Sequence, residues 1–318
     1  MKRVLLTCPL PDRVVAAAME HFEVEVRDQL EPLKVGQMRG ALVLYDGILP
    51  TLGDAFSAEV FADSERPRCR ILANFGVGYN HIDTRAARRA GISVTNTPGA
   101  VTDATADIAL TLMLMSARRA GEGERLVRSG HWAGWTPTQL LGFHMTGKTV
   151  GIVGLGRVGQ AVARRCHHGF DMRVLYTRRS GEVDIGFAAE RVQLEELLMR
   201  SDFVVLCVPS SPETHHLIGA GALGLMQPHA RLINVARGEV VDQAALIAAL
   251  ETGRIGGAGL DVYEEEPQIP EAMKALENAV LLPHLGTAAL EVREAMGLMA
   301  VENLRTCLAG EVPPNLVN

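Results

Sequence analysis

Three groups of ionisable side chains that follow predicted strands could together orient and protonate a carbonyl compound. His284 follows the apolar run VLLP, Arg237 follows LINVA, and Glu264–Glu266 follow GLDVY, in which Asp261 is expected inside a strand. Histidine can give a proton near neutral pH, and a permanently charged guanidinium can hold a carboxylate. Taken singly, an Arg after a strand or an acidic triplet before a proline is usually a solvated turn. Three such strand ends in one parallel sheet would converge on one crevice, so we expect a shared site.

A glycine turn within Thr149–Arg179 predicts the crevice in which these side chains meet. TVGIV is typical of a buried parallel strand, and Gly154, Gly156 and Gly159 follow it in G-x-G-x-x-G spacing before a helix-period run. Gly154 permits the tight turn, Gly156 lets a pyrophosphate approach the backbone, and Gly159 allows close helix–strand packing. The helix N-terminus then presents N–H groups to the phosphates. Strand, turn and helix together predict a dinucleotide site.

The same spacing recurs at Gly219, Gly221 and Gly224, but without that context. No strand is expected to end at Gly219, and Pro228 prevents a long helix after it. We interpret this second match as a loop.

The end of the strand after the glycine helix indicates the cofactor. An acidic residue about 20 positions past the glycines would bind the ribose of NAD, whereas an Arg suits a 2′-phosphate. Arg178 stands 19 residues after Gly159, between Thr177 and Arg179. A solvated basic turn would explain the same residues. We favour NADP(H), with NAD(H) as the alternative.

The composition is that of an ordinary globular protein, with 47% hydrophobic and 21% charged residues among 318. That length suggests about two domains. The formal charge of −6, which no basic block offsets, argues against nucleic acid as a partner. Five scattered cysteines indicate reduced thiols, and no apolar segment is long enough to span a bilayer. We therefore expect a cytoplasmic protein with no membrane or nucleic-acid partner and no metal.

Strand and helix signals alternate through the first 99 residues and imply a parallel sheet with crossover connections. A helix is expected from Ile82 to Ala90, with Asp83 near its start and Gly91 after its end. The breaker Asn96–Gly99 marks a crossing between domains. The strands expected here are Val4–Thr7, Val24–Val26, Leu42–Tyr45, Ile71–Ala73 and Ser93–Thr95.

A second alternation begins at Thr149 and predicts a doubly wound sheet with its ligand at the carboxyl ends of the strands. A helix is expected from Asp242 to Leu250, closed by Gly253. The last helix, Ala288–Leu308, is expected to return to the first domain, which gives domains of 1–99 plus 286–318 and of 100–285. The strands expected after TVGIV are Met172–Tyr176, Phe203–Val208, Leu232–Val235, Gly259–Val262 and Val280–Leu282.

The run TADIALTLMLMSARRA is apolar nearly all round a helix. Such a helix needs cover on more than one side. It is either a core helix or part of a subunit interface.

Five motifs, in this order, resemble the D-isomer-specific 2-hydroxyacid dehydrogenase family over essentially the whole chain: NFGVGYNHID, GIVGLGRVG, NVARGEVVD, GLDVYEEEP and LLPHLG. GHWAGWTP (Gly130–Pro137) and the TRR strand end are most similar to the glyoxylate/hydroxypyruvate reductase branch. The resemblance implies an α/β fold of two Rossmann-like domains, one dinucleotide-binding and one smaller, discontinuous and flavodoxin-like for the substrate. It also implies a homodimer that reduces glyoxylate and hydroxypyruvate to glycolate and D-glycerate with NADPH.

The resemblance assigns the reaction to Arg237, Glu266 and His284. His284 would be the general acid, and Glu266 would bind its other ring nitrogen and favour the imidazolium. Arg237 would bind the carboxylate and keto oxygen of the small 2-keto acid. Backbone N–H groups of Val77 and Gly78 would hold the carboxylate.

Further contacts are implied for the cofactor, with Asp261 at the nicotinamide carboxamide and Pro209 at the adenine. The set is Thr105, Gly154, Leu155, Gly156, Arg157, Val158, Gly159, Thr177, Arg178, Arg179, Val208, Pro209, Ala236, Asp261, His284 and Gly286.

Trp135 is implied as a substrate-site residue that reaches the neighbouring subunit, and the alternative is a Trp packed on its own domain. Two rival functions stay open at this point. One is an NAD(H)-dependent dehydrogenase of another D-2-hydroxy acid, and the other is a dinucleotide-sensing binding protein on the same fold.

Overall fold

The computed structural model describes residues 1–62 and 67–318. Contacts divide the chain into two compact units: unit 1 is Met1–Val101 with Ala288–Asn318, and unit 2 is Thr102–Thr287. Each unit is built on one parallel β-sheet with helices between its strands. The predicted α/β fold with two Rossmann-like sheets is confirmed. The substrate-binding and dinucleotide-binding roles of the two units stay predictions.

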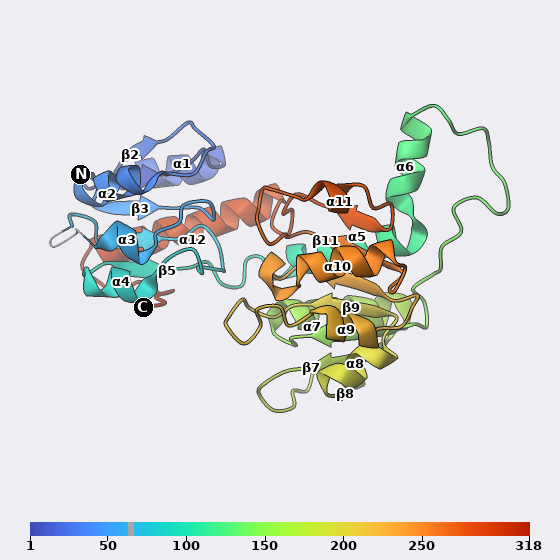
Figure 1. Cartoon of the computed structure of the whole chain (residues 1–318). Coiled ribbons are helices and arrows are strands. Elements are labelled where there is room, and N and C mark those ends of the chain that lie inside the picture. The colour runs from blue at the N-terminus through green and yellow to red at the C-terminus, as the bar shows by residue number, and fades with distance from the viewer. Residues whose placement is uncertain (63–66) are drawn as a thin grey trace. The chain divides into compact units, whose positions relative to one another are not determined.

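Unit 1 contains a five-stranded sheet in the order β2-β1-β3-β4-β5, which is the flavodoxin-like order (Figure 1). Asp83 caps α4 by accepting a hydrogen bond from the backbone N–H of Ala86 at 2.8 Å. The strands are β1 Arg3–Leu6, β2 Glu23–Val26, β3 Gly47–Leu49, β4 Ile71–Ala73 and β5 Ser93–Thr95. The helices are α1 Asp12–Met19, α2 Val35–Leu44, α3 Ala58–Phe61, α4 Thr84–Arg89 and α12 Leu290–Leu308.

Although α12 comes last in the chain, it packs within unit 1. A Cβ on Gly297 of α12 would lie 2.4 Å from Cγ2 of Val14 in α1, so the backbone of α12 lies directly against the Val14 side chain. Ala300 and Leu304 share one buried apolar cluster with Val4 of β1. The burial of this apolar face holds the end of the chain onto its first hundred residues.

The strand predicted at Leu42–Tyr45 is wrong, because these residues form the end of α2 and its C-cap. Met38 and Leu42 are buried one helical turn apart, whereas Val43 is 63% exposed. The third strand is the next segment, Gly47–Leu49. A run of four apolar residues suits both a strand and the end of an amphipathic helix, and only packing against the sheet decides between them.

Unit 2 contains a seven-stranded parallel sheet in the order β12-β11-β10-β9-β6-β7-β8 (Figure 1). The order reverses between β6 and β9, and in doubly wound sheets ligands bind at that switch point. Six of the strands lie at or next to predicted runs, and β8 was not predicted. The strands are β6 Thr149–Val153, β7 Arg173–Thr177, β8 Ala189–Arg191, β9 Phe203–Leu206, β10 Arg231–Asn234, β11 Gly257–Leu260 and β12 Ala279–Leu281. The helices are α5 Thr102–Arg118, α6 Ala120–Arg128, α7 Arg157–Phe170, α8 Leu194–Arg200, α9 Ala220–Leu225, α10 Gln243–Glu251, α11 Glu271–Lys274 and the 3-10 turn η1 Gly238–Val240.

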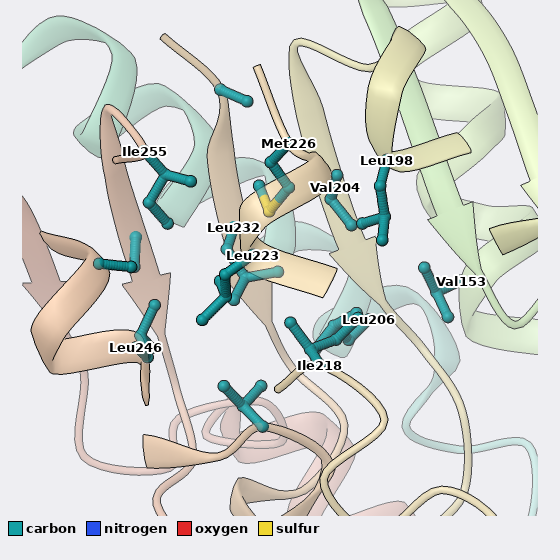
Figure 2. Close-up of a cluster of buried hydrophobic side chains, with 14 of the residues drawn as sticks. Val153, Leu198, Val204, Leu206, Ile218, Leu223, Met226, Leu232, Leu246 and Ile255 are labelled. Carbon is teal, nitrogen blue, oxygen red and sulfur yellow. The ribbon is translucent and has the colours of Figure 1, made fainter. Parts of the chain in front are cut away.

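One core of unit 2 lies between its sheet and the helices α8, α9 and α10, which follow β8, β9 and β10. Figure 2 shows Val204 and Leu206 of β9 and Leu232 of β10 with Leu223 of α9 and Leu246 of α10. All five side chains are buried. This packing orients the strands, and with them the loops that leave their carboxyl ends.

The long apolar helix is a core helix of unit 2. Ala106, Leu112 and Met113 of α5 are fully buried, and a Cβ on Gly259 of β11 would lie 2.8 Å from Cβ of Leu112. Burial on several sides explains why this helix is apolar nearly all round. Neither it nor any other helix in residues 1–62 and 67–318 is long and apolar enough to cross a bilayer.

The second glycine match forms a short helix, so the prediction of a loop is wrong. α9 covers Ala220–Leu225, with Gly219 at its N-cap and the side chain of Leu223 buried. The packing of that one leucine into the core favours a helical turn, and the helix ends before Pro228.

Candidate active site

Most of the residues predicted to do chemistry in unit 2 follow the carboxyl ends of strands in one sheet. Gly154 follows β6, Arg237 follows β10, and His284 follows β12. Asp261 comes directly after β11, which ends at Leu260, and not inside the strand as predicted. Because all seven strands are parallel, these residues emerge at one edge of the sheet.

The glycine turn at the switch point has the backbone approaches that its sequence predicts. Gly154 has φ of +97°, and a Cβ there would lie 2.8 Å from Cγ1 of Val208. A Cβ on Gly159 would lie 2.2 Å from the carbonyl oxygen of Gly154, so α7 packs directly on the turn. A Cβ on Gly156 would meet no described atom within 4 Å. Gly156 is the N-cap of α7 and no side chain of the described residues caps that helix, so its N-terminal N–H groups suit a pyrophosphate.

The other expected cofactor residues are distributed around this turn. Arg157 and Val158 begin α7, and Leu155 is buried beneath it. Val208 and Pro209 follow β9, and Ala236, which is buried, follows β10. Arg157 and Val158 therefore lie in the first turn of α7 and the other residues on loops, all at the carboxyl edge of the sheet, and their contacts with a cofactor stay predictions.

His284 and Glu266 form a hydrogen-bonded pair at this edge. Nδ1 of His284 lies 2.8 Å from Oε2 of Glu266, and the Tyr263 N–H donates to Oε1 at 2.9 Å. Burial alone would raise the pKa of Glu266, but the His284 hydrogen bond and charge, the Tyr263 N–H and the charge of Arg237 lower it below its ordinary value. His284 has φ of +54°, an uncommon backbone conformation that is found at functional sites. Glu266 is therefore an ionised partner that orients the imidazole.

Arg237 is a cation whose charge lowers the pKa of Glu266. Burial lowers the pKa of Arg237, while the charges of Glu266 and Glu239 raise it, and the guanidinium stays charged at any physiological pH. Its Nη1 donates to the carbonyl oxygen of Ala236 at 2.7 Å. The buried amide of Asn234 shapes the turn, because its Nδ2 donates to the carbonyl oxygen of Arg237 and its Oδ1 accepts from the N–H of Ala236. The structure thus brings Arg237, Glu266 and His284 into one electrostatic cluster.

Gly238 holds the Arg237 loop against the Glu266 loop, a role that the sequence reasoning missed. A Cβ at Gly238 would lie 1.9 Å from the backbone carbon of Tyr263 and 2.3 Å from the N atom of Glu264. Only a glycine allows the two backbones to touch in this way. The signal was present in the sequence, since Gly238 directly follows Arg237 in NVARG.

The Asp261 carboxylate anchors the segment that follows His284. Its two oxygens accept hydrogen bonds from the N–H groups of Leu285 at 2.7 Å and Gly286 at 2.8 Å. Burial raises the pKa of Asp261 and these N–H groups lower it, with a net rise. The Thr105 hydroxyl donates to the Gly286 carbonyl oxygen at 3.1 Å. Thr105, Asp261 and Gly286 therefore form one network next to His284, and their expected contacts with the nicotinamide stay predictions.

At the basic end of β7, Thr177 and Arg178 are half-buried and Arg179 is exposed. Nε of Arg178 donates to Oγ of Ser180 at 3.0 Å, and Nη2 of Arg191 donates to the Arg178 carbonyl oxygen at 3.2 Å. Thr177 accepts a hydrogen bond from the Gly154 N–H at 3.0 Å, which places the strand end beside the glycine turn. Arg178 and Arg179 thus lie next to the turn, where they suit a 2′-phosphate.

In unit 1, Val77 and Gly78 lie on the loop after β4. Nδ2 of Asn74 donates to the carbonyl oxygens of Gly76 at 3.0 Å and Gly78 at 2.9 Å. Nδ2 of Asn96 donates to the carbonyl oxygen of Val77 at 2.9 Å. These amides hold the loop through its carbonyl groups, a support that the sequence reasoning missed.

Trp135 does not pack on its own domain in the isolated chain, since it is 80% exposed. In Figure 1, α6 and the segment that follows it extend away from the sheet of unit 2. α6 has no buried residue, and Val127 is 58% and Trp132 51% exposed. Trp132, Trp135 and Val127 are therefore exposed apolar side chains on one extended part of this chain.

The cysteines and possible metal ligands add no chemistry to this site. Burial raises the pKa of the Cys69, Cys166 and Cys207 thiols to about 12, so they stay protonated at neutral pH. Within the described ranges, no three His, Cys, Asp or Glu side chains are grouped as a metal site.

The chain is similar to known proteins over nearly its whole length. Residues 110–286 match the family model described as the D-isomer specific 2-hydroxyacid dehydrogenase, NAD binding domain. Glyoxylate reductases of Thermococcus kodakarensis and Thermococcus onnurineus are 47% and 45% identical, each over 99% of this chain and 96% of its own length. An NADPH-dependent glyoxylate/hydroxypyruvate reductase of Sinorhizobium meliloti, solved with NADP and malonate, superposes with a TM-score of 0.87 at 33% identity, covering 99% of this chain and 96% of its own.

Proposed function

The chain belongs to the D-isomer-specific 2-hydroxyacid dehydrogenase family, and from this we propose that it reduces glyoxylate and hydroxypyruvate to glycolate and D-glycerate with NADPH. The family and the glyoxylate reductases among its relatives support a small 2-keto acid as the substrate. The pair of His284 with Glu266 beside Arg237 is the observation that carries the proposal. The expected cytoplasmic location belongs to the same proposal.

His284 is the proton donor in this reaction. Its Nδ1 is bonded to Glu266, so Nε2 is the ring nitrogen that can give a proton to the carbonyl oxygen. The Glu266 carboxylate favours the imidazolium before the proton leaves and keeps the ring oriented afterwards. A bound reduced nicotinamide supplies the hydride.

Arg237 and the loop of Val77 and Gly78 bind the substrate. A guanidinium presents a planar fork of donors that matches a carboxylate, and its charge also polarises the keto oxygen toward hydride attack. The backbone N–H groups of Val77 and Gly78 are proposed as further donors to the substrate carboxylate. Substrates without an α-carboxylate should therefore not be reduced.

NADPH is expected to give a kcat/KM at least about 10-fold above that of NADH with glyoxylate as substrate. A charge-assisted hydrogen bond contributes about 1.5–3 kcal/mol, which corresponds to roughly 10–100-fold in affinity. The double substitution Arg178→Ala and Arg179→Ala should raise the KM for NADPH by that factor and leave the KM for NADH unchanged. Arg173→Ala, an exposed Arg at the other end of β7, is the matched control. A wild-type preference for NADH would contradict the NADPH proposal and favour the NAD(H)-dependent alternative.

A homodimer in which Trp135 serves the partner's site is the assembly that we propose. Light scattering should give about twice the 34.2 kDa mass of one chain. Trp135→Ala and Arg237→Ala are each expected to be poorly active, yet their mixed dimers contain one site with both residues intact. Random mixing of the two variants should restore about a quarter of the wild-type activity. No recovery in exchanged dimers would show that Trp135 does not act across an interface.

A further inference from the structure

A second histidine–carboxylate pair lies at the same sheet edge as the first. Nε2 of His216, on the loop after β9, is hydrogen-bonded to Oε1 of Glu264. Glu264 stands two residues before Glu266, on the loop whose Tyr263 N–H holds the Glu266 carboxylate. The proposed chemistry does not use this pair.

Glu264 joins its loop to the start of α10. Its Oε2 accepts from the Gln243 N–H at 3.3 Å, and its own N–H donates to Oε1 of Gln243 at 3.4 Å. Gln243 is the first residue of α10, and a carboxylate at a helix N-terminus is favourably placed. The position of Glu264 is therefore restrained from two sides, by α10 and by His216.

The backbone of His216 is bonded to the segment that carries Arg237. The His216 N–H donates to the carbonyl oxygen of Glu239 at 2.8 Å, and the Ile218 N–H donates to that of Val240 at 3.0 Å. Oγ of Ser210, next to the expected cofactor residue Pro209, is hydrogen-bonded to Oε1 of Glu239. One short loop thus contacts the Arg237 segment through its backbone and the Glu266 segment through the His216 ring.

We propose that His216 and Glu264 are positioning residues, which keep the loops of Glu266 and Arg237 in the register that the reaction needs. Gly238 allows these two loops to touch, and the pair links them a second time, through the His216 backbone to Glu239 and through the His216 ring to Glu264. A shift of about 1 Å in a catalytic group can cost about 100-fold in rate. The inference rests on the proposed function, because the loss is measured in that reaction.

The test compares His216→Ala with His216→Gln. His216 has φ of +49°, and Ala and Gln meet the same backbone restraint there, so the variants differ in the hydrogen-bond donor to Glu264. We expect kcat for glyoxylate to fall about 10-fold or more in His216→Ala, with KM changed less than about 3-fold, and to recover largely in His216→Gln. His229→Ala is the matched control. Nε2 of His229 lies 2.7 Å from Oδ1 of Asp202, so it is also a histidine–carboxylate pair. Asp202 precedes β9 and His229 precedes β10, at the amino ends of strands whose carboxyl ends face the candidate site. His229→Ala should keep wild-type kcat.

A pH profile separates positioning from loss of fold. Glu266 is faced by His284, Arg237, Asp261 and Tyr263. If His216→Ala loosens the loop that carries Glu266, the contacts of Glu266 with His284, Arg237 and the Tyr263 N–H weaken. The pKa of Glu266 then rises, so its carboxylate takes a proton at higher pH. The acid limb of kcat/KM should then move to higher pH in His216→Ala and not in His216→Gln or His229→Ala.

Glu264→Ala extends the test without touching the His216 backbone. The double variant with His216→Ala should lose no more activity than the worse single variant, because both remove one interaction. Equal losses in His216→Ala and His216→Gln, additive losses in the double variant, or wild-type kcat in His216→Ala would each overturn the proposal. If the wild-type chain reduced no 2-keto acid, the proposed function would fail by itself. Crystal structures of wild type and His216→Ala would still test the positioning through the distance from Glu266 Oε2 to His284 Nδ1.

Discussion

Replacing His284 with Gln should lower kcat for glyoxylate reduction by about 1,000-fold, within the range that general acid catalysis contributes. Glutamine can still form a hydrogen bond to Glu266, but it cannot give up a proton at neutral pH. Transient kinetics at saturating NADPH should place the loss in the chemical step. The Kd for NADPH, measured by its fluorescence, should change less than about 3-fold, which a collapsed site would not show. A kcat within 10-fold of wild type would remove His284 as the proton donor.

Glu266→Gln provides the matched control for the histidine. It keeps a hydrogen-bond acceptor for Nδ1 and loses the negative charge, so kcat should fall less than in His284→Gln. The folded-state pKa of Glu266 lies below its ordinary value, so its contribution to stability is present above that ordinary value. This contribution is lost as pH falls through the lowered pKa. The glutamine variant should lack that part of the acid dependence of its melting temperature.

Replacing Arg237 with Ala is expected to lower kcat/KM for glyoxylate by about 1,000-fold. The loss combines the binding of the carboxylate with the stabilisation of the developing oxyanion, and removing one such donor alone typically costs about 100–1,000-fold. Both KM and kcat should therefore be affected.

Arg237→Lys tests whether the planar arrangement of guanidinium N–H donors is needed, or only the positive charge. It keeps a positive charge beside Glu266 but presents one ammonium in place of a planar pair of donors. Activity should recover only in part, and thermal unfolding of both variants should stay near wild type if Arg237 acts mainly on the substrate. A near-normal kcat/KM in Arg237→Ala would contradict its role in binding the substrate.

The local patterns of the chain predicted the elements that surround the site. TVGIV, the three glycines and the helix after them specify a strand, turn and helix by short-range sterics alone, and β6, Gly154 and α7 have that form. His284 and Arg237 could likewise be placed at strand ends, because a buried strand is a short apolar run that a polar or glycine position terminates. The family motifs then supplied the roles that local patterns do not contain.

Where a residue's environment comes from distant segments, the sequence alone misled or said nothing. Leu42–Tyr45 reads equally well as a strand, and burial of Met38 and Leu42 beneath the sheet made it the end of a helix. Gly219–Leu225 reads as a loop, and packing of Leu223 into the core made it a helix.

The sequence by itself determined the glycine turn, the strand ends and the residue types available for the chemistry, because these depend on neighbours within a few positions. The family motifs indicated Glu266 as the partner of His284, but only the tertiary structure gave the 2.8 Å contact between its Oε2 and Nδ1 of His284. The pairing of Glu264 with His216 was decided by the tertiary structure alone. The tertiary structure also decided that Gly238 lies against Tyr263 and joins two loops that are separated along the chain. Such contacts depend on the order and register of the parallel strands, which bring distant residues to one edge and which no local pattern encodes.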